Sequence, residues 1–371
     1  MRVLQVAWEY PPRLFGGLGR HVEGLTRALA SGGVSVTVVT PAHEGPEQAP
    51  PGVQVIRAPA PAVSLPDDRW LADTLDANVA MAETTLRHLG TTIPDVLHVH
   101  DWMAGHAARI LAAAMDIPVI ATIHATERGR HKGHLPPGFS AWIDAQEQAL
   151  VALADQVIVC AAHMADHVRW HLGADPSAVT VIHNGVDPTC WRPLTTRKRG
   201  NAPKRIIFAG RLEYEKGVQV LLAATRRLPC EVIVAGQGSM AQELQRAAHP
   251  RVRFAGHLDQ PALRDLLASA DIAVVPSLYE PFGLAALEAM AACVPVIASD
   301  VDGLAEVVTE GAGLRVPPDD PLALAKALRR LLRDDDLVAR LVAGGSARAA
   351  ELSWDASARK HRAVYATVTG H

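Results

Sequence analysis

The sequence alternates short runs of β-branched residues with stretches of helical periodicity, and it does so in two series. The first series of candidate strands covers residues 2–7, 35–40, 96–100, 118–123, 156–160 and 179–182. Between the first two of these, Val22, Leu25 and Leu29 form a helical stripe. The second series covers 205–209, 231–235, 252–254, 271–276, 294–298 and 313–316. Strands that alternate with helices form parallel sheets covered on both faces, so the pattern predicts an α/β protein with two such sheets.

A break between the two series predicts a domain boundary. Asn184-Gly185 and Asp187-Pro188 are typical of turns, and the polar segment 195–203, with basic residues at 197–199, has no apolar period. We predict a first domain over 1–190 and a second over 203–352, joined by a solvated linker. The 371 residues are enough for two domains, and the 49% apolar content allows two buried cores.

Charge and cysteine usage exclude several protein classes. A formal net charge of −3 gives no bulk attraction to nucleic acid or to an anionic membrane. The chain starts with a predicted strand rather than a signal peptide, and no apolar run is long enough to cross a bilayer. The four cysteines are far apart and form no paired motif: Cys160, Cys190, Cys230 and Cys293. We therefore expect a cytoplasmic protein without a transmembrane segment or a nucleic-acid partner.

Glu280 and Glu288 flank a predicted strand-to-helix turn in the segment SLYEPFGLAALE, residues 277–288. Glu280 precedes the Pro-Phe-Gly turn, and Glu288 lies about one turn into a helix predicted over 285–292. Two carboxylates can accept hydrogen bonds from sugar hydroxyls, while the helix start between them offers N–H groups to an anion. The spacing favours a ligand in which a sugar is joined to a phosphate. The alternative is one helix-capping acid and one surface acid.

Arg211 and Lys216 lie in the segment GRLEYEKGV, residues 210–218, between a predicted strand and a predicted helix. A guanidinium fork and a mobile ammonium at a helix start can neutralise a diphosphate. Without further context, two solvated surface cations would be the simpler interpretation.

Two glycine-rich turns follow predicted strands. Gly16, Gly17 and Gly19 come after the first strand, and Gly236 and Gly238 come after strand 231–235. Glycine lets a backbone approach a ligand closely, although neither turn is the G-x-G-x-x-G fingerprint of dinucleotide-binding proteins.

Histidines lie at the ends of two predicted strands. His98 and His100 alternate on one strand face and are followed by Asp101 and Trp102, and His124 ends the next strand. Because ligands bind at the carboxyl ends of parallel strands, His124 is a candidate binding residue. His98 and His100 could also reach one metal ion, but no further ligand motif accompanies them. The alternative is a set of hydrogen-bonded structural histidines.

Together these segments resemble the retaining GT-B glycosyltransferases of the glycogen-synthase-like family, of the GT4 type with its E-x7-E motif. The segments YEKGV (214–218), YEPFG (279–283) and HDW (100–102) carry the resemblance, which extends over nearly the whole chain. It implies two facing Rossmann-like domains with a deep cleft between them. It also implies that the last helix, within 354–371, returns to the first domain.

The resemblance assigns roles to individual residues. Arg211 and Lys216 would stabilise the departing diphosphate, Glu280 and His124 would contact the sugar, and Glu288 would hold the ribose. Further donor-binding residues implied by it are Gly16, Gly17, Gly19, Gly236, Gly238, Phe282, Gly283 and Leu284. Acceptor-side residues implied by it are His98, His100, Asp101 and Trp102. The expected reaction moves a hexose, glucose by default, from a nucleoside-diphosphate sugar to a hydroxyl of a glucan or small glucoside, with retention, and without metal or other cofactor.

Three departures from the family pattern leave other reactions open. Leu14 replaces a lysine, Asp302 replaces the first glycine of a Gly-Gly-x-x-Glu loop, and Cys293 replaces another glycine. One alternative is a specialised natural-product glycosyl- or pseudoglycosyltransferase with an amine or cyclitol substrate. A nucleotide-sugar epimerase or a phosphorylase on the same scaffold, and a catalytically idle sugar-nucleotide-binding protein, are the others.

Overall fold

The computed structural model describes residues 1–14, 16–43, 49–59, 70–192 and 203–370, and it divides into two compact units. Unit 1 comprises Met1–His183 and Trp354–His371, and unit 2 comprises Asn184–Ser353. Residues 184–190, which we assigned to the first domain, lie in unit 2. The predicted basic linker at 197–199 lies outside the described residues.

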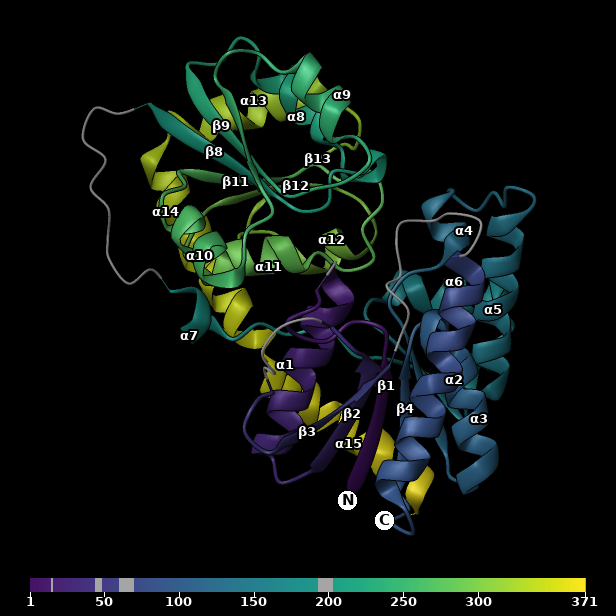
Figure 1. The fold of residues 1–371 in the computed structure, drawn as a ribbon. Coiled ribbons are helices and arrows are strands. Elements are labelled where there is room, and N and C mark those ends of the chain that lie inside the picture. Colours follow the sequence, from purple (N-terminus) through teal and green to yellow (C-terminus); the bar gives the residue numbers. More distant parts are fainter. Residues whose placement is uncertain (15, 44–48, 60–69, 193–202, 371) are drawn as a thin grey trace. The chain divides into compact units, whose positions relative to one another are not determined.

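Unit 1 is built on a seven-stranded parallel sheet with the strand order β3-β2-β1-β4-β5-β6-β7. Figure 1 labels its first four strands, β1 to β4. Its strands are β1 (Arg2–Ala7), β2 (Ser35–Pro41), β3 (Val53–Ala58), β4 (Val96–His100), β5 (Val119–Ile123), β6 (Gln156–Val159) and β7 (Val179–Val181). Its helices are α1 (Gly17–Ser31), α2 (Trp70–Leu89), α3 (Gly105–Met115), α4 (Glu127–Arg130), α5 (Phe139–Leu153), α6 (Ala162–His171) and α15 (Trp354–Thr369).

Helix α15 packs on α1, which ties the end of the chain to the first unit. A Cβ on Gly24 of α1 would overlap the indole of Trp354, so glycine lets the two helices approach closely. Val22, Leu25 and Leu29, the stripe predicted for this helix, are all buried in the same core as Tyr365 of α15. The C-terminal helix thus completes the core of unit 1.

Unit 2 repeats the pattern with a six-stranded parallel sheet in the order β10-β9-β8-β11-β12-β13. Its strands are β8 (Lys204–Ala209), β9 (Cys230–Ala235), β10 (Val252–Gly256), β11 (Ile272–Val275), β12 (Val296–Ser299) and β13 (Leu314–Val316). Its helices are α7 (Pro188–Trp191), α8 (Val218–Thr225), α9 (Ala241–Ala247), α10 (Gln260–Ala268), α11 (Leu284–Ala291), α12 (Asp302–Val307), α13 (Pro321–Leu331) and α14 (Asp335–Glu351). Figure 1 shows helices on both faces of this sheet.

The predicted strands are all present, and none of their ends differs by more than two residues. Strand β3, an edge strand that pairs with β2, was not predicted from the sequence. Its segment is bracketed by Pro50-Pro51 and Pro59, which favour a loop interpretation. The prediction of two Rossmann-like units is confirmed. Among the described residues, no helix is long and apolar enough to cross a membrane.

Candidate active site

Each sheet has one point at which the strand order reverses, between β1 and β4 in unit 1 and between β8 and β11 in unit 2. In open parallel sheets, ligands bind at such points, outside the carboxyl ends of the strands. The loops after β8 and β11 carry Arg211, Lys216 and Glu280, and the loop after β1 carries Gly16. His100 and Asp101 lie at the end of β4. The fold therefore places most predicted residues at the two expected positions.

In unit 2, the loops after β8 and β11 are joined by an ion pair. Nζ of Lys216 lies 2.9 Å from Oε2 of Glu280, and the hydroxyl of Ser277 donates to the same oxygen over 3.3 Å. The side chains of Lys216 and Glu280 are only 14% and 15% exposed, so water screens the pair weakly. Removing either partner would leave a poorly solvated charge without its counter-ion.

Arg211 has its own acidic partner. Its Nη2 lies 2.8 Å from Oε1 of Glu215, although the arginine side chain is 44% exposed. The main-chain oxygen of Glu215 also accepts a hydrogen bond from the N–H of Leu278, which fastens the two loops together. We call Arg211, Glu215, Lys216, Ser277 and Glu280 the ionic cluster. Its two cations are the kind of groups that bind phosphate oxygens.

Glycines allow these loops to touch. Gly217 has a φ of +68°, and a Cβ there would overlap the main-chain oxygen of Pro276. Gly236 has a φ of +138°, and a Cβ there would overlap the oxygen of Gly210. A Cβ on Gly238 would similarly overlap the oxygen of Leu212. Packing of one loop on the next therefore explains Gly236 and Gly238, and their contact with a ligand stays a prediction.

The second glutamate lies within helix α11. Glu288 is the fifth residue of α11 and is 6% exposed. Gly283, in the left-handed conformation, precedes the helix, and the Phe282 ring is 3% exposed in the protein interior. Phe282 as a whole therefore offers a ligand little surface, whereas Leu284, at the helix start, is half-buried.

Two of the departures from the family pattern lie in left-handed backbone, which explains why glycine is usual there. Cys293 has a φ of +59° and Asp302 a φ of +42°. The Asp302 carboxylate accepts a hydrogen bond of 3.2 Å from the N–H of Glu280, and the oxygen of Glu280 accepts one from Gly303. Asp302 thus supports the turn that carries Glu280, a role that sequence reasoning missed.

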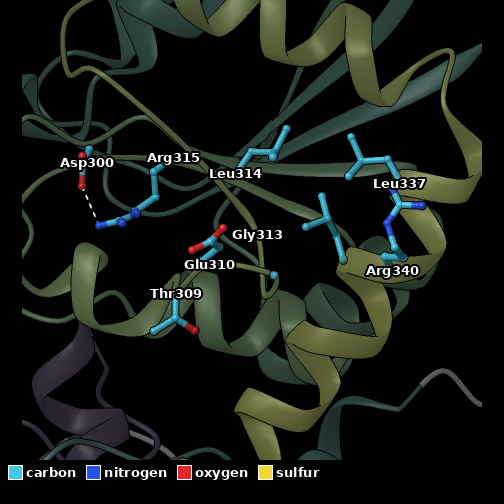
Figure 2. Close-up of a pocket in the computed structure, with 10 residues that line it drawn as sticks. Asp300, Thr309, Glu310, Gly313, Leu314, Arg315, Leu337 and Arg340 are labelled. Atoms are coloured by element: carbon cyan, nitrogen blue, oxygen red, sulfur yellow. Dashed lines mark hydrogen bonds and ion pairs between the residues drawn. The ribbon is translucent and has the colours of Figure 1, made fainter.

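A cavity of about 600 Å³ in unit 2 lies between β13, the loop before it and α14 (Figure 2). Arg315, which lines it, is already paired with Asp300 over 2.8 Å. Its lining residues are Asp300, Thr309, Glu310, Gly311, Gly313, Leu314, Arg315, Leu337, Arg340 and Leu341. None of them is a predicted site residue, so this cavity does not change the assignment of the site.

In unit 1, His98 and His100 project from the same side of β4, as predicted, with ring centroids 4.3 Å apart. His98 is fully buried, and both ring nitrogens have partners: Nδ1 lies 2.8 Å from the hydroxyl of Tyr365, and Nε2 lies 2.7 Å from the hydroxyl of Thr122. Burial lowers the pKa of His98 well below its usual value, which keeps the ring neutral. These contacts fit a structural role and leave no nitrogen for a metal shared with His100.

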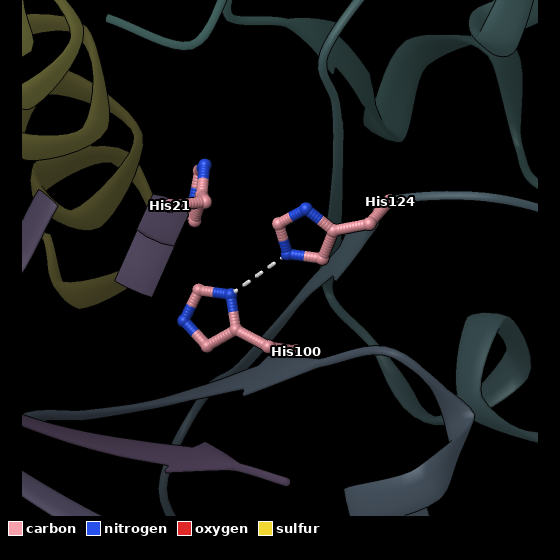
Figure 3. Close-up of side chains that lie close together, drawn as sticks. All are labelled: His21, His100 and His124. Atoms are coloured by element: carbon pink, nitrogen blue, oxygen red, sulfur yellow. Dashed lines mark hydrogen bonds between the residues drawn. The ribbon is translucent and has the colours of Figure 1, made fainter. Parts of the chain in front are cut away.

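His100 instead meets His124, which follows β5. Nδ1 of His100 lies 3.2 Å from Nε2 of His124 (Figure 3). Nε2 of His100 lies 3.2 Å from Oε1 of Gln5. His21 of α1 packs against both rings, with centroids 5.3 and 4.5 Å away. Burial lowers the pKa of His100 and brings that of His124 to about 3, so both are neutral at pH 7. His124 is half-buried, whereas His21 and His100 are buried.

One more histidine completes this region. His361 of α15 lies 5.7 Å from His98 and 6.0 Å from His21 between ring centroids. We call His21, His98, His100, His124 and His361 the histidine cluster. His21 and His361 were not predicted from the sequence, although His21, a polar residue next to Val22 of the apolar stripe of α1, was a usable signal.

Asp101 fixes the position of His124. Its Oδ1 accepts a 2.7 Å hydrogen bond from the main-chain N–H of His124, and its own φ is +59°. Burial raises the pKa of Asp101 to about 7, against the lowering effect of that hydrogen bond. Trp102 is 8% exposed and packs edge-on against Trp70 and Trp142. Asp101 and Trp102 therefore support the loops at this strand end.

The glycine turn after β1 is held by Glu9, whose Oε2 accepts a hydrogen bond of 3.1 Å from the N–H of Gly16. Gly17 begins α1, and a Cβ on Gly19 would overlap the side chain of Leu14. Leu14, the third departure from the family pattern, thus packs against this turn. Phe15 lies outside the described residues.

Comparison with known proteins agrees with this geometry. Residues 15–189 match the family model "Glycosyltransferase Family 4", and residues 203–334 match "Glycosyl transferases group 1". A glycogen synthase of Mycobacterium tuberculosis is 39% identical over 391 residues, which cover 98% of this chain and 94% of the relative. A D-inositol 3-phosphate glycosyltransferase of Xylanimonas cellulosilytica is 32% identical over 385 residues, which cover 95% of this chain and 92% of the relative.

Among solved structures, sucrose-phosphate synthase from Thermosynechococcus elongatus superimposes with a TM-score of 0.85 at 25% identity. The match covers 100% of this chain and 99% of that one. It extends over both Rossmann-like units, and the identity to the glycogen synthase is carried by nearly the full chain. The chain therefore belongs to the GT4 family of glycosyltransferases, with a fold of the GT-B type.

Proposed function

We propose that this protein is a retaining, metal-independent glycosyltransferase that moves a hexose of glucose type from a nucleoside-diphosphate sugar to a hydroxyl of a glucan or small glucoside. The observation that carries the proposal is the Lys216–Glu280 pair, with 2.9 Å between Nζ and Oε2, at the strand-order reversal of unit 2. A cation and a sugar-binding carboxylate meet there, as a sugar joined to a phosphate requires. The 39% identity to a protein named glycogen synthase supports the glucose donor and the glucan acceptor.

In the proposed donor complex, the diphosphate binds to Arg211 and Lys216. Glu215 and Glu280 hold these cations at the loops after β8 and β11 in the free protein, and the phosphate oxygens replace these carboxylates as partners of the cations. Preorganised charges of this kind stabilise the negative charge that develops on a departing group. They also supply the positive charge that a metal ion provides elsewhere, which is why we propose metal independence.

The two glutamates then serve different parts of the donor. Lys216 turns towards the phosphate, and the Glu280 carboxylate accepts hydrogen bonds from the sugar. Glu288, on the second turn of α11, holds the ribose. His124, a half-buried neutral imidazole, contacts the transferred sugar. The departing phosphate oxygen takes the proton of the acceptor hydroxyl, and attack on the same face of the sugar retains its configuration.

The proposal is tested with UDP-, ADP- and GDP-glucose. The correct donor should stabilise the protein by about 2.7 kcal/mol at a hundred times its dissociation constant. Incubated with that donor and a maltooligosaccharide in EDTA, the protein should lengthen the acceptor through an α-linkage seen by NMR. A β-linked product would contradict retention, and activity restored only by a divalent ion would contradict metal independence. The absence of any transfer would contradict the proposed acceptor.

A cyclitol acceptor is the second candidate, because a relative covered over 92% of its length is named D-inositol 3-phosphate glycosyltransferase. It rests on the same donor site, so only the acceptor in the assay changes. Transfer to inositol phosphate in preference to a glucan would favour it. An epimerase, by contrast, would convert the donor without any acceptor.

We further propose that the enzyme works in the cytoplasm. Its four cysteines, all among the described residues, form no disulfide, as is usual for proteins of reducing compartments.

A further inference from the structure

Among the described residues, the proposed function does not explain why three imidazoles gather within unit 1, those of His21, His100 and His124, which we call the imidazole triad. One ring nitrogen from each lies within 4.8 Å of the others, and Figure 3 shows the three rings facing a common space. The residues come from α1, the end of β4 and the loop after β5, so only the folded sheet brings them together. We propose that this triad binds a transition-metal ion of the Zn²⁺ class, and that the bound ion inhibits the enzyme.

The distances suit such an ion after a small movement of the side chains. Two nitrogens on a tetrahedral zinc ion, each about 2.0–2.1 Å from the metal, lie about 3.3 Å apart. Nδ1 of His100 and Nε2 of His124 are already 3.2 Å apart. The ring nitrogen of His21 lies within 4.8 Å of the other two nitrogens and must move closer to them, which a change in its χ angles can supply. Three protein ligands leave a fourth position open for water.

The hydrogen bonds prepare His100 as a ligand. The carbonyl oxygen of Gln5, 3.2 Å from Nε2 of His100, can only accept, so Nε2 carries the proton and Nδ1 presents its lone pair. Metal-binding histidines generally donate their other N–H to such an oxygen. In the free protein the Nε2–H of His124 donates to that lone pair. When the ion binds, His124 takes its other tautomer, with the proton on Nδ1, and no net proton is released.

The chemistry of the site selects the ion. Three neutral imidazoles suit Zn²⁺, Co²⁺, Ni²⁺ or Cu²⁺, whereas Mg²⁺ prefers oxygen ligands. His98 does not join the triad, because both of its nitrogens are engaged by Tyr365 and Thr122. This set of three therefore replaces the His98/His100 pair that the sequence suggested.

Inhibition rests on the proposed function, in which His124 contacts the transferred sugar. An ion on Nε2 of His124 would hold this ring and place a hydrated cation where the sugar binds. The enzyme would then be active when free of metal and inhibited by zinc. Metal binding itself does not depend on that proposal and has its own measurement.

The experiment titrates the metal-free protein with Co²⁺ and follows the visible absorption of four-coordinate cobalt. We expect one equivalent to bind, Zn²⁺ to displace it, and Mg²⁺ to have no effect. His21→Gln and His124→Gln should each weaken binding by at least about tenfold. His106→Gln, a change of the same kind on α3 outside the triad, should not. Thermal melting of each metal-free variant identifies any that fail to fold. If one of the two triad variants does not fold, cobalt binding by the other is enough to test the metal site.

Absence of the cobalt spectrum in the wild-type protein would overturn the site, as would its persistence in a folded His21→Gln or His124→Gln variant. In the transfer assay, zinc should inhibit the wild type and the His106→Gln variant. It should inhibit His21→Gln at least about tenfold less potently, relative to the variant's own metal-free rate. Cobalt binding with zinc-insensitive transfer would overturn the inhibition. A chain that binds cobalt but transfers no sugar would refute the proposed function and leave the metal site supported.

Discussion

The ionic cluster of unit 2 and the histidine cluster of unit 1 lie at equivalent places, where the strand order of each sheet reverses, but their chemistry is opposite. The first holds full charges in pairs: Lys216 with Glu280, and Arg211 with Glu215. The second holds neutral rings, whose charged forms are disfavoured by burial at His98, His100, His124 and His361. One is built to exchange a carboxylate for a phosphate, whereas the other keeps its imidazoles unprotonated.

The largest expected effect comes from removing a cation of the ionic cluster. Arg211→Ala or Lys216→Ala should lower kcat/KM by the equivalent of about 2–4 kcal/mol, because a preorganised charge that stabilises the departing diphosphate is lost. Steady-state kinetics with the preferred donor measure this. Lys204→Ala is the control, since Lys204 is 52% exposed and pairs with Asp271 at the other end of β8. Near-normal kcat/KM in both variants would remove the diphosphate assignment.

A smaller effect separates the two glutamates. Glu288→Gln should weaken nucleoside-diphosphate binding by about 1.5–3 kcal/mol, if a charged hydrogen bond to the ribose is lost. Glu280→Gln should lower turnover more than nucleotide affinity, because the positive charge of the transition state develops on the sugar. Calorimetry and kinetics on both variants measure the difference, with Glu243→Gln on α9 as the control. Reversed results would mean that the two roles are exchanged.

The histidine cluster should respond in stability rather than in nucleotide binding. In His98→Asn the shorter side chain cannot reach both Tyr365 and Thr122, so one buried hydroxyl loses its partner. We expect the free energy of unfolding to fall by about 1–3 kcal/mol. Denaturant unfolding gives this value, and nucleoside-diphosphate affinity should stay unchanged. Weakened nucleotide binding with unaltered stability would contradict a structural role for His98.

A pH dependence sharpens the comparison further. Burial raises the pKa of Glu147 to about 8 and that of Asp101 to about 7. At pH values between the unfolded and folded pKa values of these two groups, the folded protein binds more protons than the unfolded chain. The free energy of unfolding should therefore fall as pH rises from 6.5 to 8. The slope for one proton is at most about 1.4 kcal/mol per pH unit. The lowered pKa values of the buried histidines act in the opposite direction, so that stability rises with pH, but this effect belongs to the range below pH 6.5.

Glu147→Gln is the matched variant for this test. It removes the titrating group and keeps an oxygen that can accept the hydrogen bond from the N–H of Glu127. Unfolding measured at pH 6.5 and pH 8 should show a shallower decline than in the wild type. An equal decline in both proteins would rule out Glu147 as a source of the pH dependence.

The two clusters also differ in how far the sequence predicts them. Arg211 and Lys216 lie five residues apart in one loop, and Glu280 lies in a turn whose motif is local, so their segments could be read directly. The partners of the histidines could not be predicted from local segments. His98 meets Tyr365, which is 267 residues away, and His100 meets Gln5, which is 95 residues away. These contacts depend on the order of the strands and on the return of α15 to unit 1.

The same limit applies to the fold. Strands with continuous apolar runs, such as 232–235, are predictable because they are buried on both faces. Strand β3 is not predictable in this way, since only half of its residues are buried and the prolines on either side of it resemble those of a loop. The role of Asp302 was hidden for a related reason, because its hydrogen bond to the Glu280 backbone depends on how α12 begins. The motif showed the departure but not its consequence.

The most direct test of the central claim, that the ionic cluster binds the donor diphosphate, is calorimetric titration of the wild type and Lys216→Met with the nucleoside diphosphate of the preferred donor. Methionine nearly keeps the volume of the side chain and removes its charge. We predict that affinity falls roughly ten- to a hundredfold, as expected for one lost charged hydrogen bond. Equal affinities in a folded Lys216→Met variant and the wild type would contradict the claim.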